Sequence, residues 1–144
     1  YITIKFITIM KKVGSVAEFG QQRNDELWLA YRRAIASSGV VSTEILYEMT
    51  AESPTSRFWV SERRASEVIG AMLRGISISF MSPLRQQMFS EIFRRFLVYR
   101  EKFPKSTIYE ATFHAVNSPA PKFYLTPKTV KILLYKIRKL KGRK

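Results

Sequence analysis

Apolar residues recur with helical spacing in two segments of the chain that lie 65 positions apart. In both segments they fall at i, i+3, i+4 and i+7, the spacing of the buried face of an amphipathic helix. The residues are Ala65, Val68, Ile69 and Met72 in the first segment and Val130, Leu133, Leu134 and Ile137 in the second. At the same offset Leu27 matches Ile92 and Tyr31 matches Phe96. The pattern therefore predicts two copies of one helical unit.

The stretch before each apolar face is repeated as well. The first copy reads Ser53-Pro54-Thr55-Ser56-Arg57-Phe58-Trp59-Val60-Ser61, and the second reads Ser118-Pro119-Ala120-Pro121-Lys122-Phe123-Tyr124-Leu125-Thr126. Solenoid repeats have periods of roughly 20 to 50 residues. A period of 65 residues therefore indicates a duplicated small domain.

Capping residues and helix breakers predict three helices in each copy. Ser, Thr, Asn and Asp favour the position before a helix, proline favours its first turn, and glycine or proline ends it. In the first copy the expected helices run from the cap Asn24 to Gly39, from Ser42 or Thr43 to Ser53-Pro54, and onward from Ser61. In the second copy they begin at Ser82-Pro83, at Thr107 and at Thr126-Pro127, and Pro104 ends the first of them.

The expected fold is therefore mainly α, with two tandem three-helix units. We assign residues 24–75 to the first unit, 76–81 to a linker and 82–144 to the second unit, whose tail after Ile137 is expected to fray. Residues 1–23 form an N-terminal extension, in which residues 1–9 are expected to be an over-extended reading frame, because Met10-Lys11-Lys12 is a natural start for a bacterial protein. Alternatively, residues 2–6 alternate as in a short edge strand.

Composition predicts a soluble globular protein with a polyanionic partner. Of the 144 residues 46% are hydrophobic, which is enough for a core, and 25 Lys and Arg against 11 Asp and Glu give a net charge of +14. Such a charge favours nucleic acid as the first candidate. The absence of cysteine excludes disulfides, zinc-finger sites and thiol catalysis, and it suits a reducing, cytoplasmic location. No apolar run approaches the roughly 20 residues that cross a bilayer.

The positive charge is concentrated in the second unit. Residues 24–75 hold six Lys and Arg against seven Asp and Glu, whereas residues 82–144 hold fifteen against three. On the last helix, an inward apolar face leaves these residues outward: Lys128, Thr129, Lys131, Ile132, Tyr135, Lys136 and Lys139. The alternative interpretation of such a face is an ordinary solvated helix surface.

Each copy has three expected helices, and the last one begins with Ser or Thr after a turn and carries Arg or Lys near its start. This pattern resembles a helix-turn-helix DNA-binding domain, present here in two copies. In that family the last helix enters the major groove, where its early exposed residues contact base edges. The resemblance assigns this role to Arg63, Arg64, Ser66 and Glu67 in the first copy and to Lys128, Thr129, Lys131 and Ile132 in the second. Because Arg addresses guanine bidentately and Lys more often contacts phosphate, the first copy would read DNA and the second would hold it.

Two features leave alternatives to this interpretation. The first copy is nearly neutral and carries Glu62 and Glu67, so it would also suit a protein contact or a homodimer interface. In addition, the stretch from Glu52 to Val60 is longer than the roughly 3 to 4 residue turn of the standard motif.

The repeated stretch offers its own candidate contacts. Arg57 and Lys122 would suit phosphate. Trp59 and Tyr124 either pack the stretch onto the helical core or stack on unpaired bases, as aromatic side chains do in single-strand binders. Packing is the first expectation, because matched aromatic and aliphatic residues in a duplicated loop are typical of it.

Catalysis and metal binding lack the residues they need. The single histidine, His114, aligns with the inward side of the middle helix and is expected to be packed or partly buried, and no glycine-rich phosphate loop or zinc-ligand spacing exists. We therefore expect a non-enzymatic protein without cofactor or metal that grips duplex DNA through its last basic helix, as a transcriptional regulator or a mobile-element or phage factor. The alternative is an RNA-binding or structural protein of a ribonucleoprotein or virion.

Overall fold

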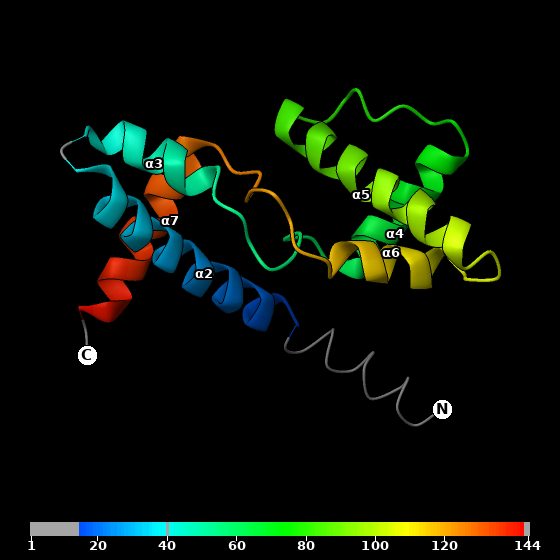
Figure 1. Cartoon of the computed structure of the whole chain (residues 1–144), viewed down its shortest axis with the longest axis horizontal. Coiled ribbons are helices and arrows are strands. Elements are labelled where there is room, and N and C mark those ends of the chain that lie inside the picture. Colours follow the sequence, from blue (N-terminus) through cyan, green and yellow to red (C-terminus); the bar gives the residue numbers. More distant parts are fainter. Residues whose placement is uncertain (1–14, 40, 143–144) are drawn as a thin grey trace. The chain divides into compact units, whose positions relative to one another are not determined.

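The computed structural model describes residues 15–39 and 41–142, with side chains from residue 19 onward. In that part of the chain the backbone forms six helices and one isolated β-bridge (Figure 1). The helices are α2 (Ser15–Ser38), α3 (Thr43–Ala51), α4 (Glu62–Leu73), α5 (Pro83–Lys102), α6 (Ile108–Val116) and α7 (Pro127–Lys141). The expected mainly α class is confirmed, whereas the strand and the start site expected in residues 1–10 lie outside the described residues.

Four predicted helix starts are confirmed. α4 follows Ser61 and α6 follows Thr107, and the hydroxyl of each cap accepts a hydrogen bond from the backbone N–H three residues on, at 3.1 and 3.0 Å. α5 and α7 begin with Pro83 and Pro127. Proline suits this position because the first N–H groups of a helix have no partner within it.

Two predicted helix limits are wrong. α2 begins at Ser15 and runs through Asn24, because extending a helix adds one hydrogen bond per residue while starting a new helix is costly. Gly39 follows α2 with a φ of +68° and ends it as predicted. α7 continues past Ile137 to Lys141, because Leu, Lys and Arg are good helix formers and cations interact favourably with a helix C-terminus.

The helices pack into two compact units that do not follow the order of the chain. The terminal unit combines residues up to 50 with residues from 127 onward and holds α2, α3 and α7, whereas the central unit consists of residues 51–126 and holds α4, α5 and α6. The predicted tandem division at residues 76–81 therefore differs from the division by packing. α4 packs with α5 and α6, and α7 packs with α2.

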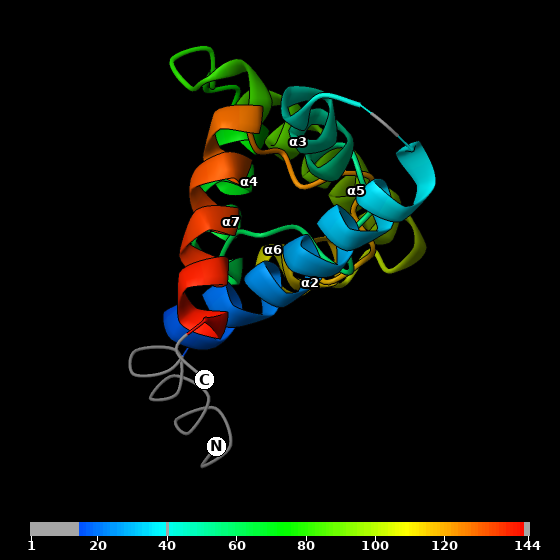
Figure 2. The same ribbon diagram turned by 90° about the vertical axis from the view of Figure 1, so that its left-hand side faces the viewer.

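In the terminal unit, the contact between α2 and α7 carries the core (Figure 2). The buried residues of the two helices are Leu27, Ala30, Tyr31 and Ala34 on α2 and Val130, Leu134 and Ile137 on α7. The ring of Tyr31 also lies 6.3 Å from the ring of Tyr47 on α3, measured between centroids. The apolar face predicted for α7 is thus its buried face.

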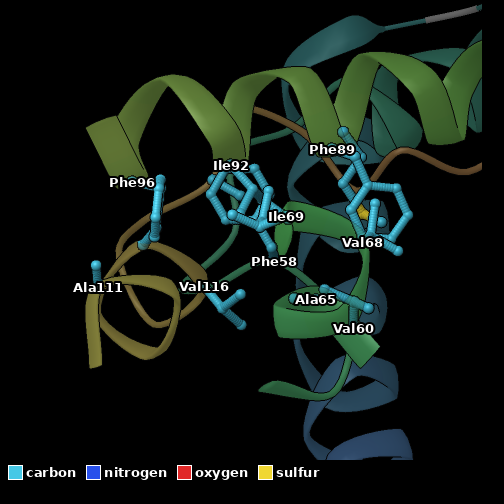
Figure 3. Packing of buried hydrophobic residues seen from close by; sticks show 13 residues of the cluster. Phe58, Val60, Ala65, Val68, Ile69, Phe89, Ile92, Phe96, Ala111 and Val116 are labelled. Carbon is cyan, nitrogen blue, oxygen red and sulfur yellow. The ribbon is translucent and has the colours of Figure 1, made fainter. Parts of the chain in front are cut away.

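The central unit has one apolar core, formed by α4, α5, α6 and the stretch that precedes α4 (Figure 3). α4 contributes Ala65, Val68 and Ile69, three of the four residues of its predicted apolar face. Further core residues are Phe58, Val60, Phe89, Ile92, Phe96 and Val116. Burial of a side chain of this size is worth about 1.5–3 kcal/mol. On α6 the small residues Ala111 and Ala115 allow close approach to α4 and α5.

Candidate nucleic-acid interface

Among the described helices, α7 has the most one-sided charge. Six of its fifteen residues are Lys or Arg, and none is acidic. Lys128, Lys131, Lys136 and Lys139 are exposed, and they share the outer side of the helix with Ile132 and Tyr135, which are 46% and 64% exposed. These six residues are called the α7 lysine face below. The structure therefore places this predicted set on one solvent-facing surface, except for Thr129, which is partly buried.

The lysines of this face are not neutralised by neighbouring acids. Within the described part of the chain, no carboxylate forms an ion pair with Lys128, Lys131 or Lys136. Lys128 also lies in the first turn of α7, at the positive end of the helix dipole, where an acidic residue would stabilise the helix and a cation does not. Helix stability therefore does not account for this lysine, whereas an external anion would.

Contacts with aromatic side chains hold α7 on α2. The hydroxyl of Tyr31 accepts a hydrogen bond of 2.7 Å from Nη2 of Arg138, whose guanidinium carbon lies 5.2 Å from the centroid of the Tyr31 ring. Nζ of Lys141 lies 5.5 Å from the centroid of the Trp28 ring. A shallow groove of about 380 Å³ beside these contacts is lined by Trp28, Tyr31, Arg32, Ile35, Ala36 and Arg138. Each exposed cation–aromatic contact is worth about 0.5–1 kcal/mol.

Sequence reasoning missed the pair formed by Tyr31 and Arg138. The available signal was a tyrosine at a position whose repeat equivalent is Phe96. A buried phenol needs a partner for its hydroxyl, and the matching phenylalanine does not. The identity of that partner, 107 positions away, could not be read from spacing.

On α4 the predicted DNA-contacting residues are electrically balanced. Arg63 and Arg64 are exposed, but Nε of Arg63 lies 3.9 Å from a carboxylate oxygen of Glu67. The hydroxyl oxygen of Ser66 is buried, so this side chain does not face a ligand as the resemblance implied. α4 holds two arginines and two glutamates in all.

Arg57 is engaged by its own stretch of chain. Its guanidinium donates hydrogen bonds to the carbonyl oxygens of Phe58 at 3.0 Å and Val60 at 2.8 Å, and it lies 3.7 Å from the carboxylate of Glu62. Burial lowers the pKa of Arg57, while the charge of Glu62 opposes this shift. The structure thus gives Arg57 a bracing role within the central unit.

Lys122 is engaged in a similar way. Its Nζ donates a hydrogen bond of 3.1 Å to Oε1 of Gln87 and lies 3.9 Å from the carboxylate of Glu52. The side chain is partly buried, and the ammonium group lies 5.4 Å from the centroid of the Tyr124 ring. A phosphate would have to compete with these contacts.

The aromatic pair of the repeated stretch is packed. Nε1 of Trp59 donates a hydrogen bond of 2.9 Å to Oγ1 of Thr55. The ring of Tyr124 stacks on Phe58 with centroids 5.9 Å apart. Burial, aided by the charge of Glu91, raises the pKa of the Tyr124 hydroxyl. These contacts agree with the packing interpretation rather than with stacking on bases.

The prediction that His114 lies on the inward side of its helix, packed or partly buried, is wrong. The side chain is exposed, and its ring lies 4.5 Å from the ring of Tyr99. α6 instead turns Ala111, Thr112 and Ala115 inward. Within the described residues, no group of three or more His, Asp and Glu side chains is placed to hold a metal ion. None of the described helices has both the length and the apolar character to cross a membrane.

Comparisons with protein families, with curated proteins and with solved structures find no match to this chain. The functional interpretation therefore rests on the residues of the site.

Proposed function

We propose that this protein is a non-enzymatic DNA-binding protein that grips duplex DNA through the α7 lysine face. The observation that carries the proposal is the charge of α7: six cationic residues and no acidic residue in fifteen, with four lysines exposed on one side. Regulation of transcription is the first role we propose for it. DNA handling by a mobile element or phage is the second, because the same grip would serve it.

The dimensions of α7 suit the major groove. An α-helix with its side chains is about 10–12 Å wide, and the major groove of B-DNA is about 12 Å wide. Lys128 and Lys139 are separated by about 16 Å along the helix axis at 1.5 Å per residue. Lysines at such positions contact phosphates and set the position of the helix, while Ile132 and Tyr135 between them offer apolar contact to base edges.

A salt titration with labelled duplex DNA tests the proposal. Each phosphate contact contributes a slope of about −0.9 to the plot of log K against log salt, because binding releases condensed counterions. Four lysines in contact would therefore give a slope near −3.6, by the same relation. Fluorescence anisotropy measures the affinity at salt concentrations from about 50 to about 300 mM, a range over which counterion release changes it measurably. An affinity that does not change with salt would contradict the proposal.

Charge reversal locates the interface. Lys128→Glu with Lys131→Glu should weaken binding about ten- to hundredfold and flatten the slope by about 2, because two phosphate contacts are lost. The matched control is Lys102→Glu with Lys105→Glu, two exposed lysines of the central unit with the same spacing. Both variants change the net charge equally, so an equal loss in both would assign the effect to overall charge instead of α7.

A comparison of ligands separates duplex DNA from the alternative class. The contacts of Trp59 and Tyr124 within the protein argue against base stacking through these two rings, because that mechanism needs accessible aromatic side chains. Duplex DNA, structured RNA and single strands are measured at the same salt concentration. Tighter binding to RNA or to single strands would favour the ribonucleoprotein alternative.

A further inference from the structure

The two repeated stretches pair with each other at equivalent residues. The backbone N–H of Thr55 donates to the carbonyl oxygen of Ala120 at 3.0 Å, and the N–H of Ala120 donates to the carbonyl oxygen of Thr55 at 2.9 Å. The two residues form the isolated antiparallel bridge of the structure, and they occupy the same position of the 65-residue repeat. An antiparallel pair that exchanges both hydrogen bonds is two-fold symmetric about its centre.

A second pair of hydrogen bonds follows the same symmetry. The N–H of Phe58 donates to the carbonyl oxygen of Val116 at 3.0 Å, and the N–H of Phe123 donates to the carbonyl oxygen of Ala51 at 3.0 Å. Adding the offset of 65 turns Phe58 into Phe123 and Ala51 into Val116. The hydrogen bonds that the first stretch donates to the second are therefore equivalent to those that the second donates to the first. The stretches at 51–60 and 116–125 form a symmetric crossover.

Beyond the crossover, each third helix packs on the first helix of the other repeat. α4, which belongs to the first repeat, packs on α5, and α7, which belongs to the second repeat, packs on α2. The buried residues correspond as well: Ile69 on α4 matches Leu134 on α7, and Ile92 on α5 matches Leu27 on α2. All four are at most 2% exposed.

We infer that the two repeats have exchanged their third helices, so that α7 is completed and positioned by the first repeat. This inference deepens the proposed function and rests on it where DNA is concerned. The DNA-binding module is then α2, α3 and α7, assembled from both ends of the chain, and Tyr31 is a positioning residue for α7. The exchange joins the two repeats as two chains are joined in a domain-swapped dimer.

Amide hydrogen–deuterium exchange of the full chain, measured by mass spectrometry, directly tests whether the third helices are exchanged between the repeats. Leu134→Ala in α7 should speed amide exchange in α2 at least tenfold, and Ile69→Ala in α4 should do the same in α5 and α6, because each change removes packing from the other repeat. If the repeats instead packed within themselves, Leu134→Ala would loosen α5 and α6, and Ile69→Ala would loosen α2. That uncrossed pattern would overturn the inference.

A cysteine pair tests the crossover at its centre. Two residues that exchange both hydrogen bonds have Cα atoms about 5.5 Å apart, within the range that a disulfide spans. Thr55→Cys with Ala120→Cys should therefore oxidise quantitatively, and the chain has no other cysteine to interfere. Moving one cysteine by a residue, as in Ser56→Cys with Ala120→Cys, turns its side chain to the other face and should prevent the bond. Equal oxidation of both pairs, or of neither, would contradict the crossover.

The two proposals fail separately. If each substitution speeds amide exchange in the other repeat but the protein binds no DNA, the exchange of third helices stands and the proposed function is contradicted. If each substitution instead speeds amide exchange within its own repeat, while DNA affinity still depends on Lys128 and Lys131, the exchange of third helices is contradicted and the proposed function stands.

Discussion

α4 and α7 are the third helices of the two repeats, and they differ mainly on one face. On the buried face, Ala65 matches Val130 and Ile69 matches Leu134, and all four are at most 2% exposed. Along its whole length α4 carries as many acidic as basic residues, whereas α7 carries no acidic residue. Packing requires the apolar face in both helices, but the fold needs no particular charge on the other. The exposed lysines of the α7 lysine face therefore have no role in packing, and this is the observation on which the proposed DNA contact rests.

The buried side of the comparison predicts equal, large losses of stability. Phe58→Ala and Phe123→Ala should each lower the free energy of unfolding by about 3–5 kcal/mol, because each removes a buried ring from an equivalent position. Urea unfolding, followed through Trp59 in the central unit and Trp28 in the terminal unit, measures the loss. Phe80→Ala is the control, since Phe80 is 77% exposed and its loss should stay within about 0.5 kcal/mol. A loss at Phe123 no larger than that at Phe80 would break the equivalence.

The exposed side of the comparison predicts unequal effects on DNA binding. Arg63→Glu with Arg64→Glu on α4 should weaken binding less than about threefold and leave the salt slope unchanged if α7 makes the phosphate contacts. The same charge change at Lys128 and Lys131 should cost at least about tenfold. Anisotropy titrations at several salt concentrations measure both the affinities and the slopes. Equal losses would mean that both third helices contact DNA.

The C-terminal ends of α4 and α7 predict a smaller difference, in the effect of a glycine substitution on the free energy of unfolding. α4 ends in a Schellman motif, in which Gly75 has a φ of +81°, its N–H donates to the oxygen of Met72, and the N–H of Ile76 donates to the oxygen of Ala71. Gly75→Ala should therefore cost about 1–2 kcal/mol from backbone strain alone, because a Cβ there meets no other atom.

Gly142→Ala after α7 is the matched substitution. Gly142 has no positive φ, and its added Cβ would come no closer than 3.4 Å, to the carbonyl oxygen of Arg138. Its unfolding free energy, measured in urea, should stay within about 0.5 kcal/mol of wild type. A cost at Gly142 equal to that at Gly75 would show that the two helices end alike.

The smallest expected effect is on the pH dependence of stability, and it concerns a difference between α5 and α2, the first helices of the repeats. Glu91 on α5 accepts hydrogen bonds from Arg94 at 2.7 Å and Arg95 at 2.7 Å, whereas the matching positions on α2 are Leu29 and Ala30. The hydrogen bond from Arg94, followed by that from Arg95, holds the pKa of Glu91 below its usual value despite partial burial.

A lowered pKa in the folded state means that Glu91 adds stability above the unfolded value, near pH 4.3, and that this stability is lost as the pH falls through the folded pKa. Glu91→Gln should therefore be slightly less stable than wild type at pH 7, with a gap that closes toward pH 3 or so. Urea midpoints between these pH values measure the gap, and a gap that widens in acid would contradict the assignment.

Local signals in the sequence were sufficient for most helix boundaries. Ser61, Thr107 and Pro127 open helices where predicted, because capping and proline geometry depend only on neighbouring residues. Asn24 was misread because a good cap residue can also lie inside a helix that has already formed. The exposed position of the α7 lysines was predictable, since it follows from the 3.6-residue period.

The bracing of the crossover could not be predicted. Arg57 and Lys122 looked like phosphate contacts because an isolated cation beside an aromatic residue is compatible with either role. Their partners are decided by the crossing of two stretches that are far apart in sequence. The same applies to Tyr31, whose partner is on the last helix.

The sequence by itself determined that the chain is mainly helical, that similar residue patterns recur 65 positions apart, and that positive charge gathers on one side of the last helix. These properties follow from periodicity, local capping and composition, which require no knowledge of distant contacts. Only the tertiary structure decided which first helix each third helix covers. The two apolar faces are alike, so their periodicity alone does not select a partner, whereas the bridge between Thr55 and Ala120 and the hydrogen bond from Arg138 to Tyr31 depend on contacts between distant parts of the chain.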